Sequence, residues 1–140
     1  MPETTFDPLE TPMWLTRPED RRWWETRVRQ IRAARASADD FHARALRAVA
    51  RAEQARADYA RMKQEYRARM AAKGIDPVTA DIRFGGMAIV KECIDDEQMY
   101  SRWASENNVS ANTEYALTAR LMEELRTFLS NRRARVPAQR

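Results

Sequence analysis

The longest segment of this chain without a glycine or an internal proline is residues 18–73, PEDRRWWETRVRQIRAARASADDFHARALRAVARAEQARADYARMKQEYRARMAAK. Alanine and arginine, which dominate it, are strong helix formers. Pro18 suits a first helical turn, and Glu19 matches the positive end of a helix dipole. Gly74 can adopt the left-handed conformation that ends a helix, and Pro77 prevents its continuation. The segment predicts one very long helix over about 18–73.

Apolar residues repeat along this segment with a period of seven. The first set consists of Trp24, Ile31, Ala38, Ala45, Ala52, Tyr59 and Tyr66. The set three positions later contains Ala34, Phe41, Ala48, Ala55 and Met62. This pattern predicts coiled-coil-like packing, with small residues at the centre and large ones towards both ends.

One position inside this segment can also begin a helix. Ser37 is a good N-cap, and Asp39 and Asp40 would then lie in a first turn. A break near residues 37–40 is therefore the alternative to a continuous helix.

The next segment predicts a second helix over about 77–106. Asp76 caps its start and Pro77 occupies its first turn. Gly85 and Gly86 interrupt it, because glycine is unfavourable inside a helix. They indicate a kink, a loop or the close passage of another helix.

A third helix is expected over about 110–132. Asn107 and Asn108 tolerate the conformation that ends a helix, and Ser110 can cap the following one. The two later helices would form a hairpin. The fold class predicted from the sequence is therefore all-α.

The segments outside these helices divide the chain. Residues 1–16 contain three prolines and predict an extended N-terminal arm, although Met13 and Leu15 are apolar enough to lie on the body of the protein. Residues 17–133 are expected to form a single helical domain, and residues 134–140 a basic, frayed tail. We expect no signal peptide and no membrane segment, because the required apolar runs are missing.

Helix lengths suggest a partner. At about 1.5 Å per residue, the predicted hairpin would cover only the C-terminal half of the 18–73 helix. The apolar residues of the other half would then be bare, which favours a homo-oligomer or a larger protein assembly. The expected contact residues are Trp23, Trp24, Val28, Ile31 and Phe41.

The net charge of +4 raises nucleic acid as an alternative partner. Basic and acidic segments alternate along the chain, which is typical of helices that neutralise one another. Arginine is nevertheless well suited to phosphate binding, and arginines cluster near both ends of the helical region. The candidate nucleic-acid contacts are Arg21, Arg22, Arg29, Arg32, Arg132, Arg133 and Arg135.

Chemistry-bearing residues are scarce. One cysteine, Cys93, and one histidine, His42, cannot build a zinc site. Cys93 is expected to be an inert thiol on an apolar helix face. The acids at residues 95–97 are expected to form ion pairs with arginines of the first helix. We therefore expect no catalytic residues, metal or cofactor, and no enzyme.

Two resemblances bear on function. Trp103-Ala104-Ser105, at an expected turn between helices, resembles the WXG-type hairpins exported by actinobacterial secretion systems, but Ser105 replaces the glycine and the first helix is far too long. In its alanine and arginine content the chain is similar to small helical proteins of actinobacterial phages and mobile elements. This resemblance implies virion assembly or a host-interacting accessory role, located in the cytoplasm or within a virion.

These observations favour a non-enzymatic helical scaffold or adaptor that acts through protein–protein contacts and self-association. The alternative is a basic helical nucleic-acid-binding protein.

Overall fold

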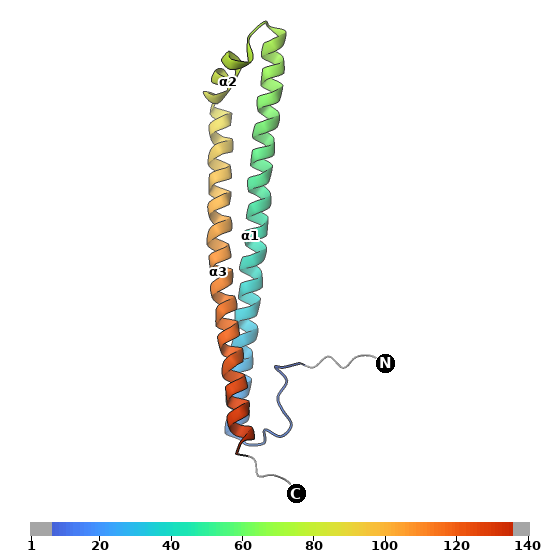
Figure 1. The fold of residues 1–140 in the computed structure, drawn as a ribbon, viewed down its shortest axis with the longest axis vertical. Coiled ribbons are helices and arrows are strands. Elements are labelled where there is room, and N and C mark those ends of the chain that lie inside the picture. Colours follow the sequence, from blue (N-terminus) through green and yellow to red (C-terminus); the bar gives the residue numbers. More distant parts are fainter. Residues whose placement is uncertain (1–6, 136–140) are drawn as a thin grey trace, which may run out of the picture. The chain divides into compact units, whose positions relative to one another are not determined.

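A computed structural model describes residues 7–135, which contain three helices and no strand. They are α1 (Pro18–Ala72), α2 (Pro77–Gly85) and α3 (Ala88–Arg133), shown in Figure 1. The all-α fold class is confirmed. Residues 1–6 of the predicted arm and 136–140 of the predicted tail lie outside the described residues.

The chain forms two compact units. Within the described residues, the terminal unit combines residues 7–39 with 111–135, and the middle unit is Asp40–Ser110. Both α1 and α3 contribute a segment to each unit.

The long first helix is confirmed, and it is continuous. α1 contains 55 residues, and Ser37 to Asp40 lie inside it without a break. Ala38 is completely buried at this point, so the segment is held as helix by packing. α1 ends as predicted: Gly74 has a φ of 81°, and the N–H of Ile75 donates to the carbonyl of Met70 over 3.0 Å.

The terminal unit is built around large apolar side chains. The beginning of α1 and the end of α3 lie side by side in it (Figure 1). The arm packs on them through Leu9 and Leu15, which are 6% and 2% exposed, while Met13 stays 94% exposed. Its core consists of Leu9, Leu15, Trp24, Val28, Ile31, Leu121 and Leu125.

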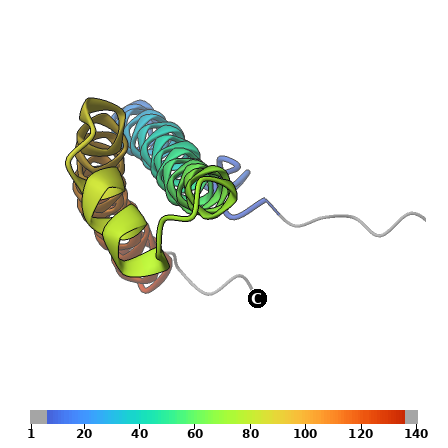
Figure 2. The same cartoon turned by 90° about the horizontal axis from the view of Figure 1, so that it is seen from above.

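The middle unit is built around small side chains. On α1 its buried residues are Ala45, Ala48 and Ala52. α2 follows the loop after α1 and lies on the α3 side of this unit (Figure 2). The other buried residues are Ala80 and Phe84 on α2 and Val90 on α3, so Phe84 is the one aromatic side chain that is fully buried among the described residues of this unit.

The boundary between the second and third helices differs from the prediction. α2 ends at Gly85, and the N–H of Met87 bonds to the carbonyl of Phe84 over 3.0 Å before α3 begins. A Cβ built on Gly85 would meet nothing within 4 Å. The glycine pair therefore separates two helices and does not mark a close helix crossing.

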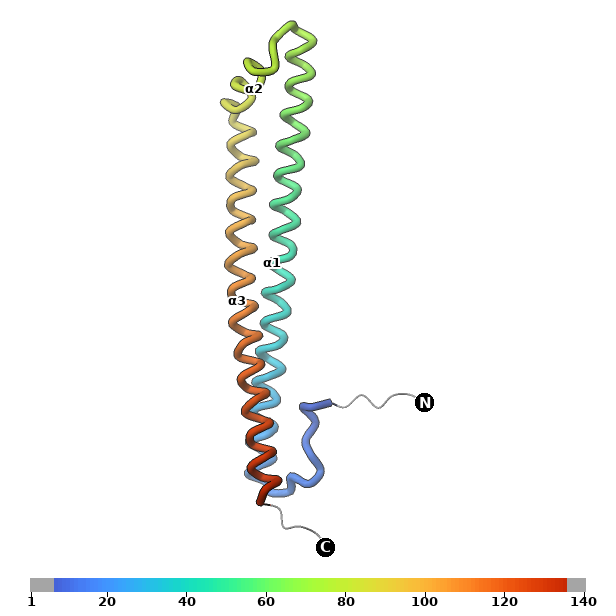
Figure 3. The backbone as a smooth tube through the Cα atoms, in the orientation of Figure 1, coloured from blue at the N-terminus to red at the C-terminus, as the bar shows by residue number. Residues whose placement is uncertain are grey.

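The predicted turn at Asn107-Asn108 is wrong, because α3, which is 46 residues long, continues through these two residues as helix (Figure 3). The side chain of Asn107 donates to the carbonyl of Trp103 over 2.8 Å, within the helix. Ala111, four residues on, is 1% exposed. Packing of this kind readily overrides the weak helix propensity of asparagine. The tripeptide at 103–105 accordingly lies inside a helix.

Candidate functional site

Exposed large apolar side chains gather in the middle unit. Among the described residues the terminal unit exposes three such side chains, Met13, Trp14 and Tyr115. The middle unit exposes nine: Leu46, Val49, Val78, Ile82, Met87, Ile89, Ile94, Trp103 and Val109. A monomer with a well-filled core rarely leaves so many uncovered in one region, so the middle unit is the candidate contact surface.

The two most exposed of these nine side chains lie on the short helix α2. Val78 is 69% exposed and Ile82 is 72% exposed, and their spacing of four residues places them on one face. The opposite face carries the buried residues Ala80 and Phe84. We call Val78 and Ile82 the outer face of α2. A helix that is apolar on two faces is expected to be covered on both.

The sequence fixes the beginning of α2 locally. Asp76 is its N-cap, and one carboxylate oxygen accepts from the backbone N–H of Thr79 over 3.1 Å. The other oxygen accepts from the Thr79 hydroxyl over 2.7 Å. These hydrogen bonds lower the pKa of Asp76 below its ordinary value, and the bond from the Thr79 hydroxyl has the largest effect.

Two contacts with α1 hold α2 in place. The Phe84 ring, 2% exposed, lies 5.6 Å from the ring of Tyr59 and 5.7 Å from that of Tyr66. The Arg67 guanidinium donates to Asp81 through Nε over 2.7 Å and through a second bond from Nη2. This hydrogen bonding lowers the pKa of Asp81 and raises that of Arg67. The outer face of α2 is therefore presented by an anchored helix.

The charges of the middle unit are divided between its two limbs. Residues 40–72, on α1, contain eight bases and four acids. Residues 73–110 contain four bases and seven acids. Part of this opposite charge is used internally, since Arg56 Nε lies 2.7 Å from Glu97 Oε1. Arg67 and Asp81 form a second such pair. Without these two pairs, residues 40–72 keep two more bases than acids, and residues 73–110 keep one more acid than bases.

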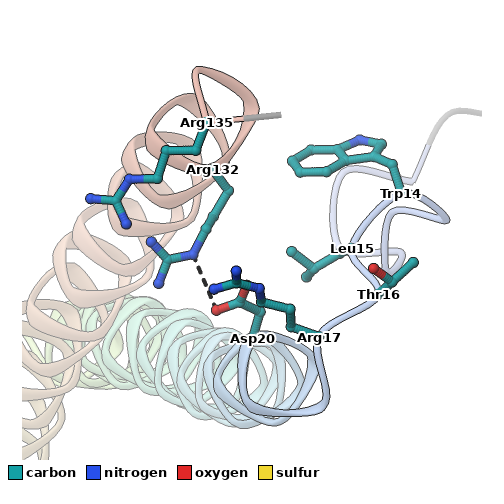
Figure 4. A pocket seen from close by; sticks show the side chains of 7 residues that line it. All are labelled: Trp14, Leu15, Thr16, Arg17, Asp20, Arg132 and Arg135. Carbon is teal, nitrogen blue, oxygen red and sulfur yellow. Dashed lines mark hydrogen bonds and ion pairs between the residues drawn. The ribbon is translucent and has the colours of Figure 1, made fainter. Parts of the chain in front are cut away.

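The terminal unit has a different kind of site, a cavity of about 220 Å³ where the arm meets the first turn of α1 and the end of α3 (Figure 4). Its most buried charged groups pair with each other: Arg132 Nε donates to Asp20 Oδ1 over 3.1 Å. Trp14, 36% exposed, forms part of the wall contributed by the arm. The Arg17 and Arg135 side chains have no ion pair among residues 7–135. The pocket is weakly basic, and its central pair joins the two helix ends.

The residues predicted for self-association lie mostly in the core. Trp24, Val28 and Ile31 are buried among side chains of their own chain. Trp23 is partly buried and stacks on Phe128, with ring centroids 4.2 Å apart. Phe41 is also partly buried. The α3 segment of the terminal unit covers the N-terminal apolar residues of α1 that the predicted shorter hairpin would have left bare. The predicted difference in length between the first helix and the segments packed on it therefore does not exist. The identity of the contact residues stays a prediction.

The arginines of the nucleic-acid alternative all lie in the terminal unit, and four of them are engaged. Arg21 and Arg22 donate to the backbone carbonyls of Leu15 and Pro18. Arg32 lies 3.8 Å from the Asp7 carboxylate. The fourth is Arg132, paired with Asp20. The side chains without such a contact among the described residues are those of Arg29, Arg133 and Arg135.

The remaining candidate groups have structural settings. Glu97 pairs with Arg56, which confirms an ion pair between the acids at 95–97 and α1. Burial, followed by nearby acids including Asp58, raises the pKa of the half-buried Cys93 thiol, which keeps it protonated. His42 is exposed. The described part of the chain contains no group of three His, Cys, Asp or Glu side chains that could hold a metal ion.

Sequence reasoning missed the exposure of the middle unit. If residues 77–106 are taken as one helix, Ile82, Ile89 and Trp103 fall on one face and are expected to pack together, but they are 72%, 43% and 48% exposed. The packed face is set by Phe84 and Val90, each 2% exposed. α2 and α3 are separate helices, so a helical period drawn across Gly85 gives the wrong phase for Ile82. Within α3, Ile89 lies next to the buried Val90 and is not part of the packed face.

The comparisons give no family: this chain matches no protein-family model, and neither a curated protein nor a solved structure is significantly similar to it. Among the described residues, no helix combines the length and the apolar character that crossing a membrane requires.

Proposed function

We propose that this chain is a non-enzymatic helical adaptor that acts through protein–protein contacts, including self-association, and that the outer face of α2 carries the contact. The observation behind the proposal is the exposure of Val78 and Ile82, at 69% and 72%, on a helix anchored by its opposite face.

The proposed partner is a second copy of this chain. In a two-fold dimer the same patch meets itself, so the two α2 outer faces cover each other. The same rotation can bring the basic limb of one middle unit, residues 40–72, towards the acidic limb of the other, residues 73–110. Complementary charge of this kind favours one orientation of the two copies.

Magnitudes suggest a weak dimer. Full burial of a valine or isoleucine side chain contributes roughly 1.5–3 kcal/mol. Association opposes this with an estimated cost of roughly 4–15 kcal/mol in lost freedom of motion. Four side chains, two from each copy, give a gain of similar size. Because the two terms nearly cancel, the outer face of α2 cannot by itself give a micromolar dimer, which needs a net gain of about 8 kcal/mol. The other exposed apolar residues of the middle unit and its complementary charges must supply the rest of the contact.

The compositional resemblance to phage-encoded helical proteins supports an assembly role for such contacts, in the host cytoplasm or in a virion. An accessory protein that docks on a host protein through the same face is the related possibility.

Light scattering over a concentration series tests the contact. The native chain is expected to approach the mass of two copies as concentration rises. Val78→Ser combined with Ile82→Ser should hold the mass at that of one copy, because these exposed positions lose their apolar surface without disturbing the buried face of α2.

The matched control is Met13→Ser in the terminal unit, where an even more exposed apolar side chain is removed. It should leave the mass unchanged. A native chain that stays monomeric throughout the concentration series would refute self-association, and equal effects of the control and the double variant would refute the assignment to α2.

A further inference from the structure

The middle unit also contains a cavity, of about 300 Å³. The proposed contact through α2 does not involve it. The side chains around it come from α1 and α3, and none is acidic. The lining residues are Arg44, Arg47, Ala48, Arg51, Tyr100, Trp103 and Asn107. A pocket lined by three cations and two aromatic rings is suited to a ligand that is both anionic and flat.

The three arginines share one face of α1, because their spacing of three and seven residues brings them near the same angle around a helix. Arg51 donates from Nη1 to the Tyr100 hydroxyl over 3.1 Å. Arg44 lies 2.9 Å from the Asp40 carboxylate on the preceding turn. Arg47 has no ion pair or hydrogen bond within the described part of the chain. Arg47 is therefore the arginine whose charge is free to pair with an incoming anion.

The aromatic wall is formed by Tyr100 and Trp103. Their rings are 5.6 Å apart in an edge-to-face arrangement, with an interplanar angle of 84°. The Arg51 guanidinium lies 5.5 Å from the Tyr100 ring centroid, so the tyrosine ring contacts both an arginine and the tryptophan. Trp103 remains 48% exposed, which leaves indole surface available for stacking.

We propose that this pocket binds one nucleotide unit, with the base stacked on Trp103 and the phosphate held by Arg47 and its arginine neighbours. Aromatic stacking with a positively charged groove is the usual way in which proteins bind unpaired nucleotides. The cavity lies at the lower end of the range of small-ligand pockets, roughly 300–1,000 Å³, which matches a single unit. That unit is either a free nucleotide or one residue of a single strand, which offer the same chemistry.

Fluorescence anisotropy with a labelled single-stranded oligothymidylate measures this binding. We expect saturable binding that weakens as salt increases. Loss of one base–aromatic stack should lower the affinity of Trp103→Ala roughly 5- to 150-fold. Arg47→Ala should weaken binding and flatten its salt dependence, whereas Trp103→Phe should restore most of the affinity lost in Trp103→Ala.

Arg133→Ala is the matched control, since it removes an exposed arginine from the terminal unit. Equal losses in Arg47→Ala and Arg133→Ala would overturn the pocket in favour of a diffuse charge effect. Absence of binding at low salt to both the labelled strand and AMP would overturn it as well. Displacement of the strand by AMP identifies a free nucleotide as the ligand, and displacement only by unlabelled strand identifies single-stranded nucleic acid.

This inference is separable from the protein contact. Val78→Ser with Ile82→Ser changes residues outside the pocket, so it should abolish dimers without changing the affinity for the oligonucleotide.

Discussion

The terminal and middle units use the same heptad stripe of α1 with side chains of different size. In the terminal unit the stripe contributes Trp24 and Ile31, which are 1% and 0% exposed. In the middle unit it contributes the buried Ala45 and Ala52, which fill much less space, and then Tyr59 and Tyr66, which are only partly buried. The first unit completes its core with the leucines of the arm. The second leaves large apolar side chains outside, so the size of the stripe residues separates a self-sufficient core from a surface that is available to partners.

The largest effect is expected in the core of the terminal unit. Trp24→Ala should lower the free energy of unfolding by roughly 3–5 kcal/mol, because it opens a cavity among buried side chains. Chemical denaturation followed by circular dichroism measures this loss. Trp103→Ala, at a half-exposed position in the middle unit, should have a much smaller effect. Similar losses in the two variants would contradict the difference between the units.

A second variant at Trp24 separates the loss of volume from the loss of a hydrogen-bond donor. The indole N–H of Trp24 is buried without a hydrogen-bond acceptor among the described residues. Trp24→Phe removes this donor and keeps most of the apolar volume. It should therefore cost much less stability than Trp24→Ala, since an unpaired buried donor is itself unfavourable.

The alanines of the middle unit allow the opposite test. Ala52 is 3% exposed, so Ala52→Leu should force extra methyl groups into a close contact and destabilise the chain by roughly 1–3 kcal/mol. Ala57→Leu, at an exposed position on the same helix, is the control and should change little. Thermal unfolding compares the two. A more stable Ala52→Leu variant would show that the middle unit has unfilled space and is not tightly packed.

The sequence was sufficient for those parts of the fold that local chemistry determines. The end of α1 at Gly74 follows from one backbone conformation, and the cap at Asp76 follows from one side chain. The buried stripe of α1 follows from a repeat that is sustained over six heptads. Each of these features needs only residues close together in the sequence.

The missed features depend on contacts between distant segments. Asn107 favours a helix end by itself, but packing around Ala111 keeps it helical. This one error shortened the predicted third helix, left Trp24 and Ile31 uncovered, and produced the inference of an interface there. The exposed position of Ile82 depends on where α2 and α3 separate, which the glycine pair leaves open between a kink, a loop and a crossing.

The smallest effect is expected from acid acting on the middle unit. Asp76 and Asp81 both have a lowered pKa in the folded chain, Asp76 because of its hydrogen bonds with Thr79 and Asp81 because of Arg67. A carboxyl of this kind contributes stability that is complete above its unfolded pKa, about 3.9, and is lost as pH falls through the lower folded value. Acidification should therefore loosen the attachment of α2 within that pH window.

The variant Asp76→Asn isolates the cap. Asparagine can still accept the backbone hydrogen bond of Thr79, but it does not titrate in this range. Its melting temperature should be slightly below that of the native chain at neutral pH, and the gap should close as pH falls below about 3.9, where the native carboxyl also loses its charge. Glu10→Gln in the terminal unit controls for the change in net charge. A gap for Asp76→Asn that is constant across this pH range would show that the charge of the carboxylate adds nothing to the cap, and the attachment of α2 would then rest on Phe84 and the Arg67–Asp81 pair.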